Sequence, residues 1–378
     1  MAAVRRRRFL IATVCTAGAL LNIWVACNLC LPGAWRGRND FLGFYAGARL
    51  VGGPHLYDRD SVREEHLRAV GETGEIQFGR LPCFAFFLKP LAWLPYYRAA
   101  AIWEMLSAMA VLAFIALWPG AAPATRWLFC CWSLPAFVAV FGGQDDLILL
   151  LWIALSARLL RAGKPFSAGM VLALCSSKFH LFLLVPVVLL AQCRWRVLCG
   201  VSAGLAALLA ISFGVAGPTW PWNFYQVLAD VRISTGLSHM PNLHSMVAGA
   251  GQLALPLQIA ATLALAAGMF LAARAARSLE APLGVALMAG VLVGFHGYLA
   301  DGALFLPGLM ALSSATAAYA RWPSLVLATP IPWALLQLPT PIPAVAQLLI
   351  VVSASAGMVW LARSPARGLI AQAGSLDG

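Results

Sequence analysis

The chain has 378 residues, of which 61% are hydrophobic and 11% charged, and its formal net charge is +12. An ordinary globular protein has about 25% charged residues, so this composition excludes a soluble globular enzyme. Apolar stretches of about 20 residues cross a bilayer as helices, because a helix satisfies its own backbone hydrogen bonds in lipid. The sequence therefore predicts an all-α polytopic membrane protein.

The amino terminus carries four arginines, Arg5 to Arg8, before an apolar stretch at residues 9–31. This stretch is too long for a signal peptide and no cleavage site follows, so we expect a retained first span. The segment from Cys83 to Pro95 is too short to span and contains Pro90, which indicates a re-entrant or interfacial segment. Twelve spans are expected, at residues 9–31, 97–118, 127–141, 145–160, 166–177, 180–193, 195–217, 246–272, 281–296, 302–320, 323–338 and 344–362.

The charges provide an independent test of this topology. With both termini in the cytoplasm, fifteen basic and two acidic residues fall on the cytoplasmic side, eleven of each fall on the other side, and Glu104 is expected inside the bundle. This is the positive-inside bias, and it accounts for the net charge without a nucleic-acid partner.

The one sizeable polar stretch, Pro32 to Leu81, lies on the outer side and carries seven of the fourteen acidic residues. Within it, residues 41–50 predict a short helix on the membrane surface, and a second surface helix is expected to start at Asp60. We expect a single domain over residues 1–378, with outer loops at 32–81 and 218–245.

Asp40 stands just beyond the first apolar segment. A carboxylate there can face both water and lipid, and it could take a proton from a hydroxyl while the bilayer delivers a lipid-borne group. The alternative is a helix cap, a position that favours Asp and Asn.

Other polar residues converge on the same outer side. An ionisable group at membrane depth costs about 2.5 to 3.5 kcal/mol, so their convergence predicts a polar site. Several alternatives stay open: Lys178 could extend to the interface, Asp145 and Asp146 could cap a helix, His296 could be a buried hydrogen-bonding residue, and Asp301 could be a loop acid. The residues concerned are Gln144, Asp145, Lys178, His180, Asn242, His244, Ser245, His296, Tyr298 and Asp301.

The nine cysteines lie mostly inside apolar segments. Cys27 and Cys30 have the spacing of half a zinc site, but no second pair or histidine lies nearby, so buried apolar cysteines are the better interpretation. No acidic cluster has the spacing of a metal site either. We expect no metal and no other cofactor.

Taken in order, the polar segments resemble glycosyltransferase family 87, whose members are GT-C-class transferases that use polyprenyl-phosphate sugars. The resemblance covers about residues 39–310. It rests on Asp40-Phe41 to Tyr45, Gly53 to Asp58, Lys89-Pro90-Leu91, Gly143-Gln144, Ala168-Gly169, Lys178-Phe179-His180 and Asn242 to Ser245. The chain departs from the family in having Phe179 where Pro is usual, and in separating Tyr298 from Asp301.

The resemblance implies a GT-C-type bundle of about twelve transmembrane helices in the bacterial inner membrane, with a periplasmic first loop that carries short surface helices. Asp40 would be the general base of an inverting transfer to a lipid or glycan acceptor, with Lys178 and His180 near the donor phosphate. The negative charge of a leaving phosphate also favours a cation such as Arg38 nearby. Substrate contacts are expected from Asn39, Tyr45, Gln144, Asp145, Asn242, His244, Ser245, His296, Tyr298 and Asp301.

Two other classes share much of this pattern. A transporter or flippase of lipid-linked sugars would need polar residues at the bilayer midplane and repeats of topology, and the sequence shows no repeat. A polymerase or ligase of lipid-linked glycans would have the same geometry with a different donor.

Overall fold

The computed structural model describes residues 2–34, 36–37, 39–72, 76–230 and 236–363, and these residues form helices and turns without a β-strand. The first half contains α1 (Ala2–Ala34), α2 (Asp40–Leu50), α3 (Arg59–Val70), α4 (Pro82–Leu88), η1 (Leu91–Trp93), α5 (Tyr96–Leu117), α6 (Pro123–Trp132), α7 (Leu134–Phe141), α8 (Asp146–Arg161), α9 (Pro165–Ala173), η2 (Leu174–Phe182) and α10 (Val185–Ala191). The second half contains α11 (Trp195–Ala216), α12 (Trp220–Ala229), η4 (Leu237–His239), α13 (Leu243–Val247), η5 (Ala248–Leu253), α14 (Ala254–Ala275), α15 (Glu280–Val293), η6 (Leu299–Phe305), α16 (Leu306–Ser313), α17 (Ala318–Leu327), α18 (Pro330–Leu335) and α19 (Pro343–Arg363).

Five helical segments of the described chain are long and apolar enough to cross a membrane. They are Arg5–Ala34, Tyr96–Leu117, Trp195–Ala216, Leu243–Ala275 and Pro343–Arg363. Two bent pairs, one of α6 with α7 at 63° and one of Pro165–Phe182 with α10 at 110°, raise the number to seven if each pair is one span. The twelve predicted spans are therefore not confirmed, although a multi-pass membrane protein is supported.

The difference arises because hydropathy does not detect breaks or burial. The expected span at 281–296 is α15, a 14-residue helix whose residues 282–293 are all buried, so its apolar character serves the protein core. The expected spans at 302–320 and 323–338 are divided into η6, α16, α17 and α18, and two of these helices have a proline at their start. The segment from Cys83 to Pro95 forms two short helices and no span, as predicted.

The first polar loop is built differently from the prediction. Residues 41–48 of α2 are all buried, so α2 is not a surface helix. It packs against α3, α4 and α5, and the ring of Phe41 stacks on Trp103 with centroids 5.6 Å apart. The predicted surface helix near Asp60 is present as α3, where Asp58 caps the start by accepting a hydrogen bond from the Ser61 N–H at 2.9 Å.

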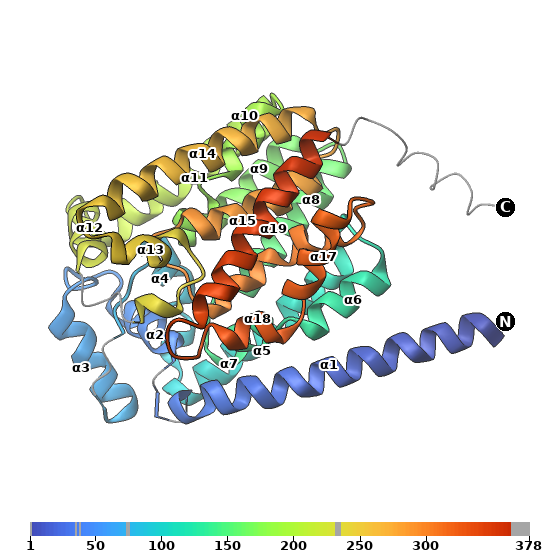
Figure 1. Ribbon diagram of the computed structural model, residues 1–378. Coiled ribbons are helices and arrows are strands. Elements are labelled where there is room, and N and C mark those ends of the chain that lie inside the picture. Colours follow the sequence, from blue (N-terminus) through green and yellow to red (C-terminus); the bar gives the residue numbers. More distant parts are fainter. Residues whose placement is uncertain (1, 35, 38, 73–75, 231–235, 364–378) are drawn as a thin grey trace.

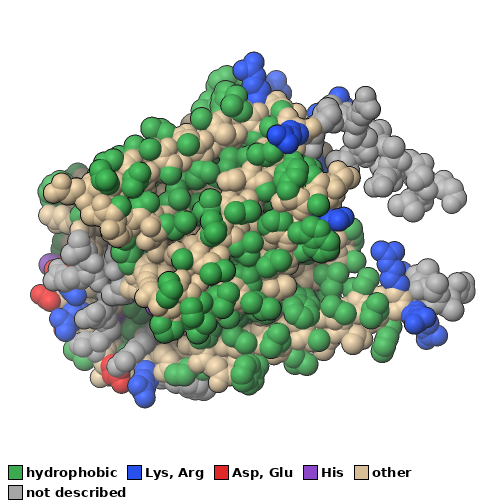
Figure 2. All heavy atoms as spheres, in the orientation of Figure 1, with side chains coloured by type: hydrophobic (Ala, Val, Ile, Leu, Met, Phe, Trp, Pro, Cys, Tyr) green, Lys and Arg blue, Asp and Glu red, His purple; other side chains and the backbone are tan. Residues whose placement is uncertain are grey.

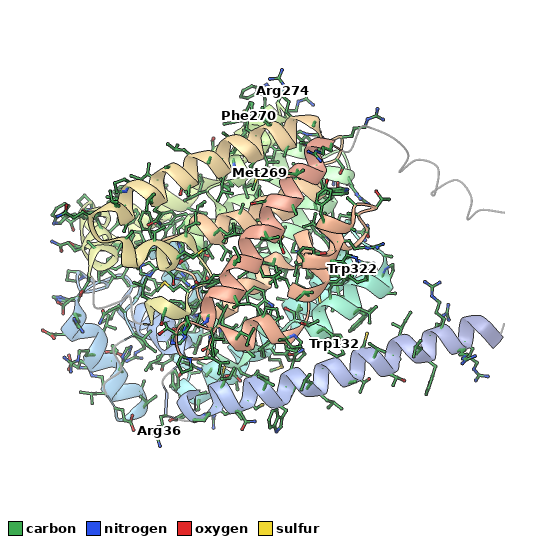
Figure 3. All side chains as sticks on the ribbon, in the orientation of Figure 1. Arg36, Trp132, Met269, Phe270, Arg274 and Trp322 are labelled. Carbon is green, nitrogen blue, oxygen red and sulfur yellow. The ribbon has the colours of Figure 1, made fainter. Side chains whose placement is uncertain are left out.

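The two ends of the bundle differ. Figure 1 shows that the start of α1 and the end of α19 lie at one end, whereas α2, α3, α12 and α13 lie at the opposite end. Hydrophobic side chains cover much of the flank between them (Figure 2). Arg36 lies at the end that carries α3, and Arg274 lies far from it near the end of α14 (Figure 3). The candidate site is at the end that carries α2.

Candidate active site

A cavity of about 750 Å³ lies among α2, the loop before α4, η2, α12 and the segment between α15 and η6. Its wall includes eight of the residues expected from the sequence, which come from five separate parts of the chain. They are Asp40, Gln144, Lys178, His180, His244, His296, Tyr298 and Asp301. The fold therefore brings most of the predicted site together.

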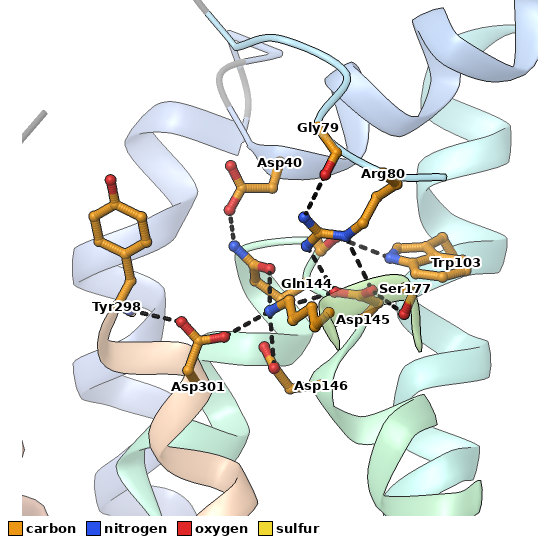
Figure 4. A network of polar contacts seen from close by, with 12 residues as sticks. Asp40, Gly79, Arg80, Trp103, Gln144, Asp145, Asp146, Ser177, Tyr298 and Asp301 are labelled. Atoms are coloured by element: carbon orange, nitrogen blue, oxygen red, sulfur yellow. Dashed lines mark hydrogen bonds and ion pairs between the residues drawn. The ribbon is translucent and has the colours of Figure 1, made fainter. Parts of the chain in front are cut away.

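Asp40 is the first residue of α2, and Asn39 occupies the N-cap position with extended backbone angles. The carboxylate is thus not the capping group of this helix, although a negative charge suits its first turn. The Asp40 N–H donates to the Gly142 carbonyl oxygen at 3.1 Å. Its side-chain Oδ2 accepts a hydrogen bond from Nε2 of Gln144 (Figure 4). The turn before α8 therefore fixes both the backbone and the carboxylate of Asp40.

The environment of Asp40 changes its protonation. Burial raises the pKa of Asp40 to about 6, whereas the nearby charges of Lys178 and Arg80 lower it and those of Asp301 and Asp145 raise it. Burial disfavours the charged form of a carboxylate, which is how a carboxylate becomes a better proton acceptor. At neutral pH Asp40 is mostly ionised and still basic enough to take a proton from a hydroxyl.

The turn that holds Gln144 depends on Gly143. Its φ is +70°, and a Cβ there would lie 2.8 Å from the Cβ of Phe41, so a larger residue would meet both backbone strain and a clash. The Gly143 carbonyl oxygen accepts a hydrogen bond from Nε1 of Trp103 at 2.9 Å. This packing explains why residue 143 is a glycine.

Lys178 interrupts the helical geometry of η2, with φ −118° and ψ 49°. Its Nζ donates to Gln144 Oε1 at 3.1 Å, Asp146 Oδ1 at 2.8 Å and Asp301 Oδ1 at 2.7 Å, and it lies 3.3 Å from Asp145 Oδ1. The side chain is only 4% exposed, so the proposal that it extends to the interface is wrong. An ammonium has three N–H groups, and protein acceptors take all of them.

Asp145 and Asp146 flank the start of α8. Asp145 is the N-cap residue, but its side chain makes no capping hydrogen bond. Both carboxylates instead contact the ammonium of Lys178. The group at the centre of this acidic cluster is therefore the lysine Nζ. Among the described residues, no three or more His, Cys, Asp or Glu side chains are placed to hold a metal ion.

Arg80 is the main cavity residue that the sequence analysis missed. Its Nη2 lies 3.1 Å from Asp145 Oδ1 and its Nε donates to Asp145 Oδ2 at 3.3 Å. The guanidinium carbon lies 5.1 Å from the centroid of the Phe44 ring. The Ser177 hydroxyl, in η2, donates to the same carboxylate at 3.3 Å. No local pattern marks Arg80, because its partner is 65 residues away.

Histidines and Tyr298 form another part of the wall. Nδ1 of His244 lies 3.0 Å from Gln258 Oε1, and the His244 ring lies against Phe295 with centroids 5.8 Å apart. The Tyr298 N–H donates to Asp301 Oδ2 at 2.6 Å, so the separated Tyr298 and Asp301 are joined through the backbone. This side of the cavity offers aromatic rings and hydrogen-bonding groups.

Two predicted residues next to Asp40 face away from the cavity. Asn39 Oδ1 accepts a hydrogen bond from the Tyr96 hydroxyl at 2.7 Å, and the Tyr45 hydroxyl donates to the Leu94 carbonyl oxygen at 2.8 Å. These contacts anchor α2 and do not line the cavity. Arg38, expected near the donor phosphate, lies outside the described residues.

Asn242 and Ser245 also take structural positions. Asn242 caps α13 by accepting from the Ser245 N–H at 3.0 Å, and its Nδ2 donates to the Gly294 carbonyl oxygen at 3.0 Å. The Ser245 hydroxyl accepts from Gln347 Nε2 at 2.9 Å. Both residues therefore fix the segment that presents His244 to the cavity.

Comparison with known families identifies a matching family profile. The sequence profile of glycosyltransferase family 87 matches residues 82–307, a range that includes Gln144, Lys178 and Asp301 and begins after Asp40. No curated protein and no solved structure gives a significant match. Because the family profile covers more than half of the chain, the protein belongs to glycosyltransferase family 87.

Proposed function

We propose that the protein transfers a mannose-like hexose or a pentose from a polyprenyl-phosphate donor to a lipid or glycan acceptor, with inversion at the anomeric carbon. Family membership makes it a membrane glycosyltransferase. The observation that carries the rest is Asp40, a carboxylate with a pKa of about 6 in the wall of a 750 Å³ cavity that also contains Arg80 and three histidines.

The reaction is a direct displacement. The acceptor hydroxyl oxygen forms a bond to the anomeric carbon while the bond from that carbon to the phosphate oxygen breaks, and the electron pair leaves with the phosphate. The hydroxyl proton passes to Asp40, which later releases it to water. Such base assistance contributes about 10²- to 10⁴-fold.

Gln144 positions the base in this scheme. Its Nε2 binds one oxygen of Asp40 while its Oε1 accepts from Lys178, so the amide cannot rotate without losing a buried hydrogen bond. No other described residue donates a hydrogen bond to the Asp40 carboxylate. The second oxygen is the one proposed to meet the acceptor hydroxyl.

The leaving phosphate gains negative charge and needs positive charge and hydrogen-bonding groups nearby. Lys178 and His180 are proposed to lie near it, with Arg38 as a further partner. His244, His296 and Tyr298 are proposed to contact the sugar and acceptor. Neither a metal ion nor a cofactor has a part in this scheme.

The proposed location is the bacterial inner membrane, with the cavity on the periplasmic side. The support is that α2, whose Asp40 lines the cavity, lies at the end of the bundle opposite the start of α1 and the end of α19 (Figure 1). A lipid donor could then enter sideways from the outer leaflet. The acceptor would approach from the periplasm.

The test uses purified protein in lipid nanodiscs with polyprenyl monophosphate derivatives of mannose and arabinose. Wild type should consume one of them and release polyprenyl phosphate, and chelation with EDTA should leave the rate unchanged. Asp40→Asn should lower turnover at least about a hundredfold with donor binding retained. Asp58→Asn is the matched control, because Asn caps α3 as well as Asp does and Asp58 is outside the cavity.

Near-normal turnover by Asp40→Asn would remove Asp40 from the mechanism. Movement of the lipid-linked sugar across a liposome membrane without transfer would instead identify a flippase. Transfer only from a lipid diphosphate glycan would identify a polymerase or ligase.

A further inference from the structure

A second cavity of about 300 Å³ lies among α4, α5, α8, η2 and α11. Its lining is almost entirely apolar and includes Phe84, Trp103, Trp152, Leu174 and Leu208. Ligand pockets have volumes of about 300 to 1,000 Å³, so this cavity is large enough for part of a ligand. The transfer chemistry proposed above does not use it.

The two cavities are adjacent and share part of their walls. Ser177 lines both of them. Arg80, in the first cavity, forms an ion pair with Asp145, which lines the second. Phe44 of the first cavity and Phe84 of the second are in edge-to-face contact with ring centroids 5.1 Å apart. A ligand with a charged end and an apolar end could therefore occupy both.

The second cavity also reaches the outer surface of the bundle. Phe87 belongs to its lining and is 53% exposed. The helices α5 and α11 on either side are long and apolar enough to cross a membrane. An apolar chain held there could continue from the cavity into the surrounding lipid.

Arg80 is the cation at this wall with hydrogen-bond capacity to spare. Of its five N–H groups, one each on Nε, Nη1 and Nη2 donates to Asp145 or to the Gly79 carbonyl oxygen. Among the described residues this leaves one N–H on each terminal nitrogen, a pair that suits a phosphate oxygen. Lys178, by contrast, has all three of its N–H groups directed to protein acceptors.

We propose that a polyprenyl phosphate binds across both cavities, with its phosphate on Arg80 and the first isoprene units of its chain in the second cavity. The remainder of the chain lies in the bilayer. A glycan acceptor does not suit the second cavity, because its apolar side chains would leave hydroxyl groups without partners. This assignment rests on the proposed function in one respect, that the donor is a lipid phosphate sugar.

The test compares adjacent residues of α11. Leu208 lines the second cavity, whereas Leu209 does not and is 41% exposed. Leu208→Trp fills the cavity, and Leu209→Trp adds the same side chain outside it. Binding of farnesyl phosphate, undecaprenyl phosphate and inorganic phosphate is measured for each variant in nanodiscs.

Wild type and Leu209→Trp should bind farnesyl and undecaprenyl phosphate at least tenfold more tightly than inorganic phosphate. Leu208→Trp should lose most of this difference while its affinity for inorganic phosphate is unchanged. If Leu208→Trp does not fold, Leu174→Trp replaces it at another position of the same cavity. Arg80→Gln should weaken binding of all three ligands.

Equal binding of the lipid phosphates by Leu208→Trp and Leu209→Trp would overturn the assignment. Equal wild-type affinity for inorganic and lipid phosphates would show an anion site only and would also overturn it. Transfer from a polyprenyl-phosphate sugar by Leu208→Trp at the wild-type KM would refute the cavity assignment and leave the proposed function intact. Binding that depends on the isoprene chain, without any transfer, would refute the proposed function and leave the cavity assignment intact.

Discussion

At the scale of single residues, the pKa of Asp40 gives a direct test of its role. A general base must be ionised, and burial raises the pKa of Asp40 to about 6. We therefore expect kcat/KM to rise with pH through about 6 and to level off above it, and to fall tenfold per pH unit below. A pH profile between 4.5 and 8 measures this. A profile that stays flat across that range would exclude a titrating base with this pKa.

The contacts of Lys178 change the effect on stability that we expect when this lysine is replaced. From the sequence alone, a lysine that serves only the donor could be replaced without harm to the fold. In the structure, however, Asp145, Asp146 and Asp301 surround its ammonium. Removing one partner of a buried ion pair costs about 3 to 5 kcal/mol, because charges stay buried without compensation.

We therefore expect Lys178→Met to lower the melting temperature clearly as well as to abolish transfer. Neutralising a neighbour in Lys178→Met/Asp146→Asn should recover part of the stability without recovering transfer. Thermal unfolding in nanodiscs checks both variants against wild type. An unchanged melting temperature for Lys178→Met would contradict a structural role for this ion cluster.

Residue types predicted much of the cavity wall, because ionisable groups such as Lys178 are costly in apolar segments and need a use. Their detailed contacts were not predictable. Arg80 lies in a polar loop where an arginine is ordinary, and only the fold brings it to Asp145. Asn242 shows the opposite error. The sequence predicted that it contacts the substrate, whereas in the structure its side chain caps a helix.

At the scale of elements, the close packing of α9 against α11 determines where η2, and with it Lys178, is placed. A Cβ on Gly169 would lie 2.1 Å from the Val197 carbonyl oxygen, so only glycine allows this approach. We expect Gly169→Val to destabilise the protein by at least about 1 to 3 kcal/mol, since overpacking forces the backbones apart. Gly214→Val on α11 is the control, because no atom lies within 4 Å of its Cβ position.

Thermal unfolding and turnover are measured for both variants, so that the loss of stability and the loss of transfer are followed separately. Gly169→Val should lose both stability and transfer, whereas Gly214→Val, at an open position, should change stability much less and keep its turnover. Equal melting temperatures for the two variants would contradict the tight contact between α9 and α11.

The apolar segments were located well from the sequence, but their roles were not. The predicted spans at 97–118, 195–217 and 344–362 correspond to single long helices, α5, α11 and α19. Apolar composition is equally compatible with α15, which is buried in the protein core. Only packing distinguishes a helix that faces lipid from one that faces other helices, and local hydropathy contains no information on packing.

At the scale of the whole molecule, the charge distribution predicts one orientation in the membrane. Fifteen basic and two acidic residues were assigned to the cytoplasmic side from the sequence. The start of α1 and the end of α19 lie together at one end of the bundle, and α3 lies at the other (Figure 1). Basic residues stay on the cytoplasmic side during insertion, so the end with α3 and the cavity is expected in the periplasm.

Reporter fusions test this orientation. A reporter that is active only in the periplasm should give a signal when it is inserted at Gly71, the exposed C-cap of α3. A reporter that is active only in the cytoplasm should give a signal at the carboxyl terminus. A third fusion near Arg194, between α10 and α11, should behave like the carboxyl terminus, because Arg194 was assigned to the basic cytoplasmic side. Signals from Gly71 and the carboxyl terminus on the same side would overturn the topology. If both signals were cytoplasmic, the cavity would lie away from the outer leaflet, and the donor would then have to come from the cytoplasmic side.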